Sequence, residues 1–321
     1  MTGNARVVVI GGAGFIGAHV CAALRRAGFA TVATGRPPVP VLGADLLPES
    51  GSFVEAELED LATMQQLMSE AETVICLASN SLPATSNSDM GSEVHHHVES
   101  TVRLAQIASE SGVSRFVFAS SGGTVYGRSS TVDVSEDSPT QPMSAYGVSK
   151  LATENYLRVL GHLSPMTTLS LRVANPYGPG QRTDRRHGFI STAIECALQG
   201  TPLTIWGDGS ARRDFVFVED VARAFVAGAA YDGPFPVVNI GSGRATSLLE
   251  AVAWVQDALE VDLDVRFEAS RPVDVPVNSL AIDRAEAELQ WHPTVDLVDG
   301  IRRTAQARLD VMAADGVSVR G

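Results

Sequence analysis

The fold is decided near the start of the chain, where Val7-Val8-Val9-Ile10 is followed directly by Gly11-Gly12-Ala13-Gly14-Phe15-Ile16-Gly17. The continuous apolar run predicts a strand buried in a parallel sheet. We expect Gly11 to make a tight turn, Gly14 to let the backbone approach a phosphate, and Gly17 to let helix and strand pack closely. The free N–H groups and positive dipole end of the following helix suit a pyrophosphate. The stretch therefore predicts a dinucleotide-binding site.

Composition narrows the class of protein. The 321 residues suffice for one large α/β domain or two smaller ones. The formal net charge of −13 disfavours nucleic acid and anionic membranes as partners, because both bind basic surfaces. No apolar run approaches the length of a membrane span, and no signal peptide is expected before the first strand. Cys21, Cys76 and Cys196 lie in apolar contexts, which indicates reduced thiols in a cytoplasmic protein.

Strand and helix patterns alternate through the first half of the chain, which indicates parallel strands joined by right-handed crossovers, with helices on both faces. The expected strands are 7–10, 31–34, 74–77, 116–120 and 168–173, and the expected helices are 16–27, 61–69, 98–111 and 145–160. We therefore expect an α/β fold in which residues 1–175 form a Rossmann-type, doubly wound parallel sheet.

The amino-acid composition changes after residue 175, where glycine and proline become frequent and arginines cluster. Residues 176–213 and 246–321 are expected to form a smaller, mixed C-terminal domain. Residues 214–245 are expected to return to the first domain, because Val237–Ile240 looks like another core strand.

A candidate reacting group is the pair Tyr146 and Lys150, which are four residues apart on a predicted helix and so lie on one face. An ammonium charge favours phenolate, so the pair predicts a lowered tyrosine pKa and an acid or base usable near neutral pH. The alternative is a packed tyrosine beside a solvated lysine.

Through the glycine loop, the Tyr146–Lys150 pair and further motifs, the chain resembles the extended short-chain dehydrogenase/reductases, specifically the nucleotide-sugar epimerase/dehydratase group. The resemblance runs nearly from end to end. Its motifs are the glycine loop at 11–17, Ser-Ser-Gly-Gly-Thr-Val-Tyr-Gly at 120–127, Tyr146 with Lys150, Arg-Val-Ala-Asn-Pro-Tyr-Gly at 172–178, Trp-Gly-Asp-Gly-Ser at 206–210, Arg-Asp-Phe-Val-Phe-Val-Glu-Asp at 213–220, and Arg271-Pro272 with Asp274.

The resemblance implies a role for each matching residue. Tyr146 would exchange a proton with a sugar hydroxyl while hydride moves to or from the nicotinamide, and Lys150 would bind the nicotinamide ribose. Asn175, Arg213 and Arg271 would meet the diphosphate of the nucleotide sugar, for which guanidinium is a suitable donor, and Trp206 would flank the nucleotide base. The implied cofactor-binding residues are Gly11, Gly14, Phe15, Ile16, Gly17, Arg36, Glu57, Leu58, Leu77, Ala78, Tyr146 and Lys150.

One departure from the family concerns a hydroxyl. The family usually has serine or threonine at the position of Gly122, where it polarises the reacting oxygen. Ser121 and Thr124 are the nearest replacements. Ser121 is one residue off, which on a strand points to the opposite face, so we prefer Thr124 as the source of the hydroxyl. The alternative is that a water molecule fills the gap.

A second departure excludes related reactions. The dehydratases have an Asp-Glu pair, and the decarboxylases a glutamate, at positions that here are Gly123 and Thr124. Elimination needs a carboxylic acid to protonate the leaving hydroxyl, so neither reaction is expected.

The cofactor choice stays open at Gly35 and Arg36. NAD-binding relatives have an acidic residue after the second strand, whereas this chain has glycine followed by a guanidinium that could bind a 2′-phosphate. The cofactor is therefore NAD or NADP, and Arg36 favours NADP. No metal site is expected at His95-His96-His97, because consecutive helical residues point in different directions; His97 falls where relatives often have asparagine.

The leading hypothesis is a 4-epimerase of a nucleotide-diphosphate sugar, in which hydride leaves sugar C4 and returns to the other face of a 4-keto intermediate. The first alternative is an NADPH-dependent reductase of a 4-keto-deoxysugar nucleotide. The second is a non-catalytic dinucleotide-binding regulator. The helices at 98–111 and 145–160 carry more apolar surface than one sheet face can cover. In the family such a pair forms a dimeric four-helix bundle, so the resemblance implies a homodimer; the alternative is that both helices pack on the core. The sequence leaves the sugar and the nucleotide base open.

Overall fold

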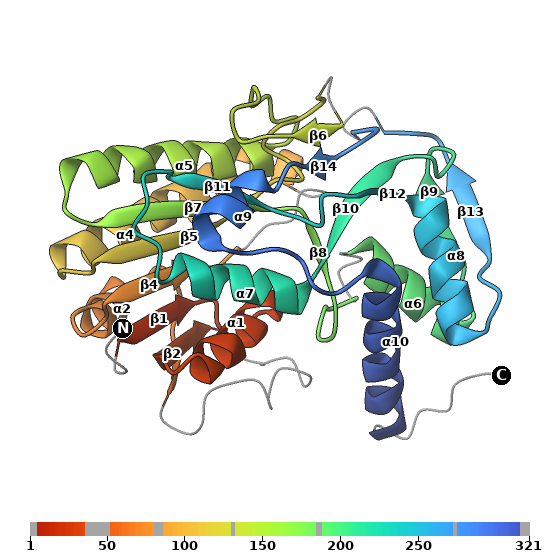
Figure 1. The fold of residues 1–321 in the computed structure, drawn as a ribbon, viewed down its shortest axis with the longest axis horizontal. Helices are drawn as coiled ribbons and strands as arrows, with labels where there is room; N and C mark the ends of the chain where they lie inside the picture. Colours follow the sequence, from red (N-terminus) through yellow and green to blue (C-terminus); the bar gives the residue numbers. More distant parts are fainter. Residues whose placement is uncertain are drawn as a thin grey trace.

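The computed structural model describes residues 5–35, 52–79, 86–129, 132–183, 188–271 and 275–314. Arg36, Pro272 and Asp274, which the sequence analysis singled out, lie outside these ranges. The described part consists of a large parallel sheet with helices on both faces and a second region of small sheets and helices beside it (Figure 1).

The central sheet has seven strands, all parallel, in the order β11-β7-β5-β4-β1-β2-β3. Its members are β1 (Arg6–Ile10), β2 (Ala30–Gly35), β3 (Phe53–Glu55), β4 (Thr73–Cys76), β5 (Arg115–Ser121), β7 (Thr167–Val173) and β11 (Val237–Ile240). This confirms the Rossmann-type doubly wound sheet, and β11 joins it as the sequence predicted. The short edge strand β3 was not predicted.

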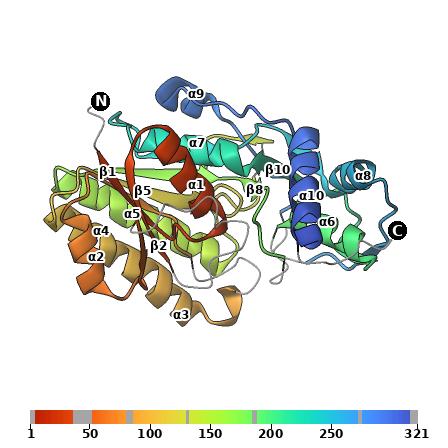
Figure 2. The ribbon, with the colours of Figure 1, turned by 90° about the horizontal axis from the view of Figure 1, so that it is seen from below.

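Alternate residues of β1 pack into different cores, which is why this strand is a continuous apolar run. Val7 and Val9 pack with α1 (Phe15–Arg26) and α7 (Val218–Gly228). Val8 and Ile10 pack into the opposite core, which α2 (Leu61–Met68), α4 (Ser100–Glu110) and α5 (Ala145–Leu163) cover. Figure 2 shows the two groups of helices on opposite faces of the sheet.

The helix expected at 98–111 begins differently. The chain enters it through a short helix α3 (Met90–Glu93) and a π-helix η3 (Val94–Glu99), and regular α4 starts only at Ser100. The three consecutive histidines lie in η3. A π-helical turn is wider than an α-helical one and is frequent at functional sites.

The second region is mixed, as predicted. One sheet contains β8 (Asn175–Tyr177), β10 (Arg212–Phe217) and β12 (Ala245–Ser247), with β10 parallel to β8 and antiparallel to β12. The strands β9 (Leu203–Trp206) and β13 (Val265–Glu268) form a parallel pair. The helices α6 (Phe189–Gln199), α8 (Leu248–Leu259) and α10 (Leu297–Ala314) share a third apolar core with these strands.

Two smaller elements connect the regions. The strands β6 (Asp133–Val134) and β14 (Ser279–Leu280) pair in parallel, and α9 (Asp283–Leu289) packs on β11 and α7. Asp214 of β10 is fully buried and accepts hydrogen bonds from the backbone N–H groups of Ser242, Gly243 and Leu280. The carboxylate thereby fixes three chain segments at the border between the sheet and the second region.

Candidate active site

A large cavity opens at the carboxyl ends of β1 and β4, where the strand order reverses and α/β sheets bind ligands. It extends into the second region and has a volume of about 1190 Å³. The predicted site residues that line it are Gly11, Gly14, Phe15, Ile16, Gly17, Glu57, Leu58, Leu77, Ala78, Ser121, Tyr146, Lys150, Asn175, Trp206, Arg213 and Arg271. Most of the site residues that the sequence singled out therefore line this cavity, together with many residues that it did not single out.

The glycine loop fits a pyrophosphate. Gly11 has φ +82°, a conformation that favours glycine, and a Cβ on Gly17 would collide with the Gly11 carbonyl oxygen. Gly14 begins α1 without a side-chain cap, and the first turn contains no acidic residue. The free N–H groups at this helix start therefore line the cavity, where an anion can accept from them.

The packing at the end of β2 explains why Gly35 stands where NAD-binding relatives have an acidic residue. A Cβ on Gly35 would lie 2.6 Å from the Cβ of Ala13 in the glycine loop, so a larger residue here requires the loop to move. Glu57 and Leu58 line the cavity nearby, as does Glu59. Arg36 follows Gly35 but lies outside the described residues.

The helix α5 brings Tyr146 and Lys150 together. Ser144 caps its start by accepting from the Gly147 N–H at 3.2 Å, and the Tyr146 N–H donates to Ser86 Oγ at 3.1 Å. The Lys150 Nζ donates to the Ala119 carbonyl oxygen at 2.9 Å and lies 5.4 Å from the centre of the Tyr146 ring. Both side chains thus share one face of the helix, as their spacing predicted.

The expectation of a lowered tyrosine pKa is wrong for this structure. Burial raises the pKa of Tyr146 to about 12, against a smaller lowering by a hydrogen bond with Ser79, and the charge of Glu93 raises it further. Burial also lowers the pKa of Lys150 to about 8. Removal from water disfavours the charged form of both groups.

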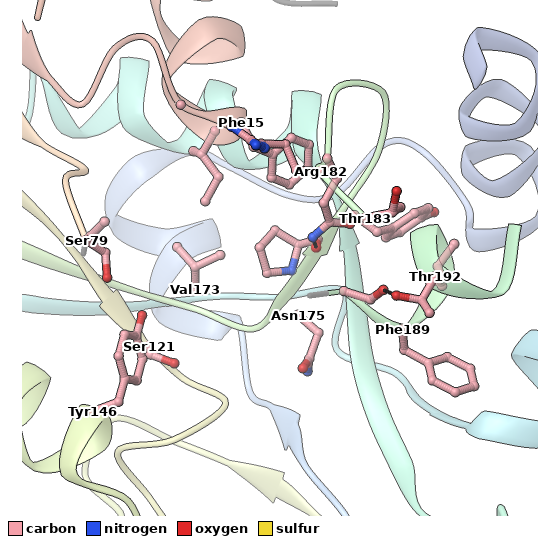
Figure 3. A pocket seen from close by; sticks show the side chains of 18 of the residues that line it. Phe15, Ser79, Ser121, Tyr146, Val173, Asn175, Arg182, Thr183, Phe189 and Thr192 are labelled. Carbon is pink, nitrogen blue, oxygen red and sulfur yellow. Dashed lines mark hydrogen bonds between the residues drawn. The ribbon is translucent and has the colours of Figure 1, made fainter. Parts of the chain in front are cut away.

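The structure also changes the choice of hydroxyl. Ser121 lies at the end of β5, lines the cavity and is beside Tyr146 (Figure 3). Thr124 is not among the lining residues, and its buried Oγ1 has no hydrogen-bond partner in the part of the chain that the structure describes. A side chain at Gly122 would press on Leu280 and the Arg172 carbonyl oxygen instead of facing the cavity. The expectation that Thr124 replaces a hydroxyl lost at 122 therefore has no support in this geometry.

Sequence reasoning missed Ser79. This residue follows β4, lines the cavity and forms a side-chain hydrogen bond with Tyr146. Figure 3 shows Ser79 near the hydroxyl end of Tyr146. Its signal in the sequence was its place directly after the predicted Leu77 and Ala78, but no motif marks it.

The far end of the cavity is aromatic and basic. The guanidinium carbon of Arg271 lies 4.3 Å from the centre of the Trp206 ring, a distance typical of a cation–π contact. Arg213 donates through Nη1 to the Val275 carbonyl oxygen at 2.7 Å, and Asn175 donates to the Asp214 carbonyl oxygen at 3.1 Å. Arg182, from the stretch after residue 175 in which arginines cluster, also lines the cavity (Figure 3).

The three histidines point to separate partners. His95 contacts Glu99, with its Nδ1 2.9 Å from Oε2, and His96 contacts Glu59 at 3.4 Å. His97 is buried, and its ring meets the Tyr146 ring edge-on with 6.3 Å between centroids. Burial lowers the pKa of His97 to about 4, so this imidazole is neutral near pH 7.

The model of the NAD dependent epimerase/dehydratase family matches residues 7–241. The chain belongs to this family. The match spans the glycine loop, Tyr146, Lys150 and Arg213, all of which line the cavity.

Among curated members of the NAD dependent epimerase/dehydratase family, the chain is 33% identical over 308 residues to a UDP-glucose 4-epimerase of Mycolicibacterium smegmatis, covering 94% of this chain and 97% of that protein. It is also 33% identical over 310 residues to a dTDP-4-dehydro-6-deoxyglucose reductase of Escherichia coli, covering 92% of this chain and 95% of that protein. Two relatives of equal identity to this chain therefore have different names, one an epimerase and the other a reductase.

Solved structures of UDP-glucose 4-epimerases have the same fold. The enzyme of Thermotoga maritima with UDP-glucose has a TM-score of 0.90 and 29% identity, covering 96% of this chain and 99% of that chain. The enzyme of Thermus thermophilus with NAD has a TM-score of 0.86 and 29% identity, covering 94% and 98%. Within the described residues, no helix is long and apolar enough to cross a membrane.

Proposed function

We propose that this chain is an NAD-dependent 4-epimerase of a nucleotide-diphosphate sugar. The main support is that one cavity is lined by the glycine loop, by Tyr146 with Lys150, and by Arg213 and Arg271. Its volume of about 1190 Å³ exceeds the usual size of a site for one small molecule and suits two nucleotide ligands.

In this proposal Tyr146 takes the proton of the sugar C4 hydroxyl and returns it to the keto oxygen. A nicotinamide cofactor held by the glycine loop would supply the hydride acceptor and donor at C4, so the epimerisation would involve no net oxidation. A phenol whose pKa burial raises to about 12 holds its proton at neutral pH and is suited to the return step. Lys150, the only lysine of the chain, supplies the positive charge that the phenolate needs in the first step.

We assign the hydroxyl that orients the reacting oxygen to Ser121, with Ser79 as a second hydroxyl beside the phenol. Both serines line the cavity next to Tyr146 (Figure 3). A cavity hydroxyl can donate a hydrogen bond to a developing oxyanion, which typically contributes a few kcal/mol to catalysis.

The second region is assigned to the nucleotide sugar. Arg213 and Arg271 provide rigid guanidinium donors for a diphosphate, and Trp206 offers an apolar ring surface for a nucleotide base. In this division residues 1–175, with the returning segment 214–245, bind the dinucleotide, and residues 176–213 and 246–321 bind the sugar donor.

NADP is a further candidate cofactor. The absence of a carboxylate at Gly35 removes repulsion toward a 2′-phosphate, and Arg36 supplies a cation next to it. An Arg36→Ala variant is then expected to lose affinity for NADP and to keep its affinity for NAD, as measured by calorimetric titration. Equal effects on both cofactors would remove the argument for NADP.

We also propose a cytoplasmic homodimer. Val148, Tyr156, Val159 and Leu163 leave an exposed apolar stripe along α5, with Tyr156 55% and Leu163 80% exposed. A second copy pairing through α4 and α5 would bury this stripe, and light scattering should then report twice the mass of 33.8 kDa. All three cysteines are free, which suits a reducing compartment.

One experiment separates the candidate functions. The purified protein is offered UDP-glucose, UDP-N-acetylglucosamine and UDP-glucuronic acid without added cofactor, and the products are separated by chromatography. Formation of the 4-epimer supports the proposal. Turnover only of a 4-keto-deoxysugar nucleotide with added NADPH would instead support a reductase, which the similarity to the Escherichia coli reductase keeps as the second candidate. Tight cofactor binding without any turnover would leave the regulator.

A further inference from the structure

One hydrogen bond joins the helix of the glycine loop to the second region, and none of the proposed catalytic steps uses it. His19 Nε2 on α1 lies 2.9 Å from the carbonyl oxygen of Pro179, which is 160 residues away in the sequence. A carbonyl oxygen can only accept, so Nε2 carries the hydrogen and donates it. The imidazole is 7% exposed and is not part of the cavity lining, so any effect on a ligand must pass through its neighbours.

On one side, His19 contacts the part of α1 that borders the cavity. Phe15 lines the cavity, and its ring meets the His19 ring edge-on, with 6.1 Å between centroids and 83° between planes. The two residues are four apart and so lie on one face of the helix. A dinucleotide that accepts hydrogen bonds from the free N–H groups at the start of α1 would therefore also restrain the turn that contains His19.

On the other side, the acceptor belongs to a loop that forms part of the cavity wall. Residues 178–183 follow β8, and Gln181, Arg182 and Thr183 line the cavity. Figure 3 shows the last two among the lining side chains. Gly178 and Gly180 have φ +149° and +86°, so the backbone turns here in conformations that favour glycine.

The same loop is fixed to α6. Gln181 donates through Nε2 to the Pro176 carbonyl oxygen at 3.1 Å, and its Oε1 accepts from Ser191 Oγ at 2.6 Å. Ser191 lies on α6 between Ile190 and Thr192, both of which line the cavity. The loop therefore connects a helix of the second region to the helix of the glycine loop, and the bond to His19 is its link to the latter.

We infer that His19 is a positioning residue that ties residues 178–183 to α1, so that a dinucleotide bound at the glycine loop orders this loop for the nucleotide sugar. The bond forms only when the loop lies against α1. A ligand that restrains α1 thus reduces the conformational entropy that the loop still has to lose when the second ligand binds. The inference rests on the proposed function only for the identity of that second ligand.

Hydrogen exchange of the loop amides, measured by mass spectrometry, tests this without turnover of any substrate. The protein is prepared free of nucleotide and compared with and without saturating NAD. We expect NAD to slow exchange at residues 178–183 by about 2- to 10-fold, because coupling through one neutral hydrogen bond cannot exceed what that bond contributes. The His19→Phe variant keeps an aromatic ring beside Phe15 and removes the donor. In this variant NAD should slow exchange of the loop by less than about 2-fold.

Three further variants make the test specific. His19→Gln keeps an N–H donor of comparable reach and should restore the NAD-dependent slowing. His19→Ala also lacks the donor but leaves room for a water molecule to bond the Pro179 carbonyl oxygen, so it serves if the phenylalanine variant does not fold. His292→Phe changes an exposed histidine and should behave as the unchanged protein.

The outcomes distinguish this inference from the proposed function. Equal slowing by NAD in the unchanged protein, His19→Phe and His19→Ala overturns the role of His19, as does the absence of slowing in the unchanged protein. Slowing that requires the donor at position 19, in a protein that turns over no nucleotide sugar, supports His19 and rejects the proposed function. If both hold, KM for the nucleotide sugar should rise by about 2- to 10-fold in His19→Phe, with kcat within about 2-fold of the unchanged protein.

Discussion

Arg172 on β7 and Glu154 on α5 form a buried two-pronged pair, with Nε 3.0 Å from Oε1 and Nη2 2.7 Å from Oε2. The pair joins the central sheet to the helix that contains Tyr146 and Lys150. Tyr126 accepts a hydrogen bond from Arg172 at 2.9 Å and donates to Asn239 of β11 at 2.7 Å, and Ser120 donates to Glu154. This network fixes α5 against the sheet, and with it the candidate active site.

We predict that Glu154→Gln strongly destabilises the fold. The substitution leaves the buried guanidinium of Arg172 without its anion, and breaking such a pair typically costs about 3–5 kcal/mol. Chemical denaturation measures the change. Asp264→Asn removes one member of the exposed Arg266–Asp264 pair and should change the free energy of unfolding by less than about 1 kcal/mol. Equal effects of the two substitutions would contradict the account.

Tyr146→Phe is expected to abolish most epimerase activity. The variant loses the proton-exchanging hydroxyl, and proton transfer by a positioned side chain contributes about 10²- to 10⁴-fold. Because the ring still fills the same space, NAD binding should change little. Steady-state kinetics and cofactor titration measure the two properties separately, and full activity in this variant would show that Tyr146 is not the acid–base residue.

The choice between two hydroxyls predicts different effects for two similar substitutions. Ser121→Ala should lower kcat by about 10-fold or more, as expected for the loss of one hydrogen bond to the reacting oxygen. Thr124→Val should affect kcat little, because its hydroxyl does not line the cavity. A larger loss in Thr124→Val than in Ser121→Ala would return the role to Thr124.

Loss of a side chain that donates hydrogen bonds to the substrate diphosphate should mainly raise KM. Arg213→Ala removes a guanidinium that lines the sugar end of the cavity, and a charge-assisted hydrogen bond contributes about 1.5–3 kcal/mol. We therefore expect KM for the nucleotide sugar to rise by about 10- to 100-fold, with the affinity for NAD unchanged. The exposed Arg266 of β13 serves as the matched control; an Arg266→Ala variant with the same rise in KM would argue against a specific role for Arg213.

His97 makes stability depend on pH. Its pKa is lowered from 6.5 to about 4 in the folded protein, so the unfolded chain binds this proton more readily. The contribution of the neutral His97 ring to the free energy of unfolding is fully present above pH 6.5. This contribution falls by up to about 3 kcal/mol as the pH decreases toward 4. The free energy of unfolding of His97→Asn should therefore fall less over this pH interval than that of the unchanged protein. Parallel curves would show that His97 is not held neutral.

The sheet could be predicted because its strands are buried on both faces and therefore appear as apolar runs. Every central strand except β3 was expected, and β3 has only the residues Phe53–Glu55 with no fully buried side chain. The start of α4 was misplaced because no sequence pattern distinguishes the π-helix Val94–Glu99 from an α-helix. The small sheets of the second region depend on contacts between distant segments, such as β6 with β14.

The part of the cavity lining that belongs to sequence motifs could be predicted, but the electrostatics of the site could not. Spacing alone places Lys150 near Tyr146, and it does not show how deeply both are buried. Burial reversed the expected direction of the Tyr146 pKa shift. In the same way, the direction of a side chain at Gly122 depends on Leu280, which is far away in sequence. The side-chain hydrogen bond between Ser79 and Tyr146 joins α5 to the segment after β4, which is distant in sequence.

The most direct test of the central claim follows the hydrogen at sugar C4. A UDP-sugar that the protein turns over is prepared with deuterium at C4 and incubated with the purified protein and no added cofactor. We predict that the 4-epimer forms with the deuterium still at C4, because the hydride leaves and returns within one site. Product that has exchanged its deuterium with solvent, or product that appears only when NADPH is supplied, would contradict the account.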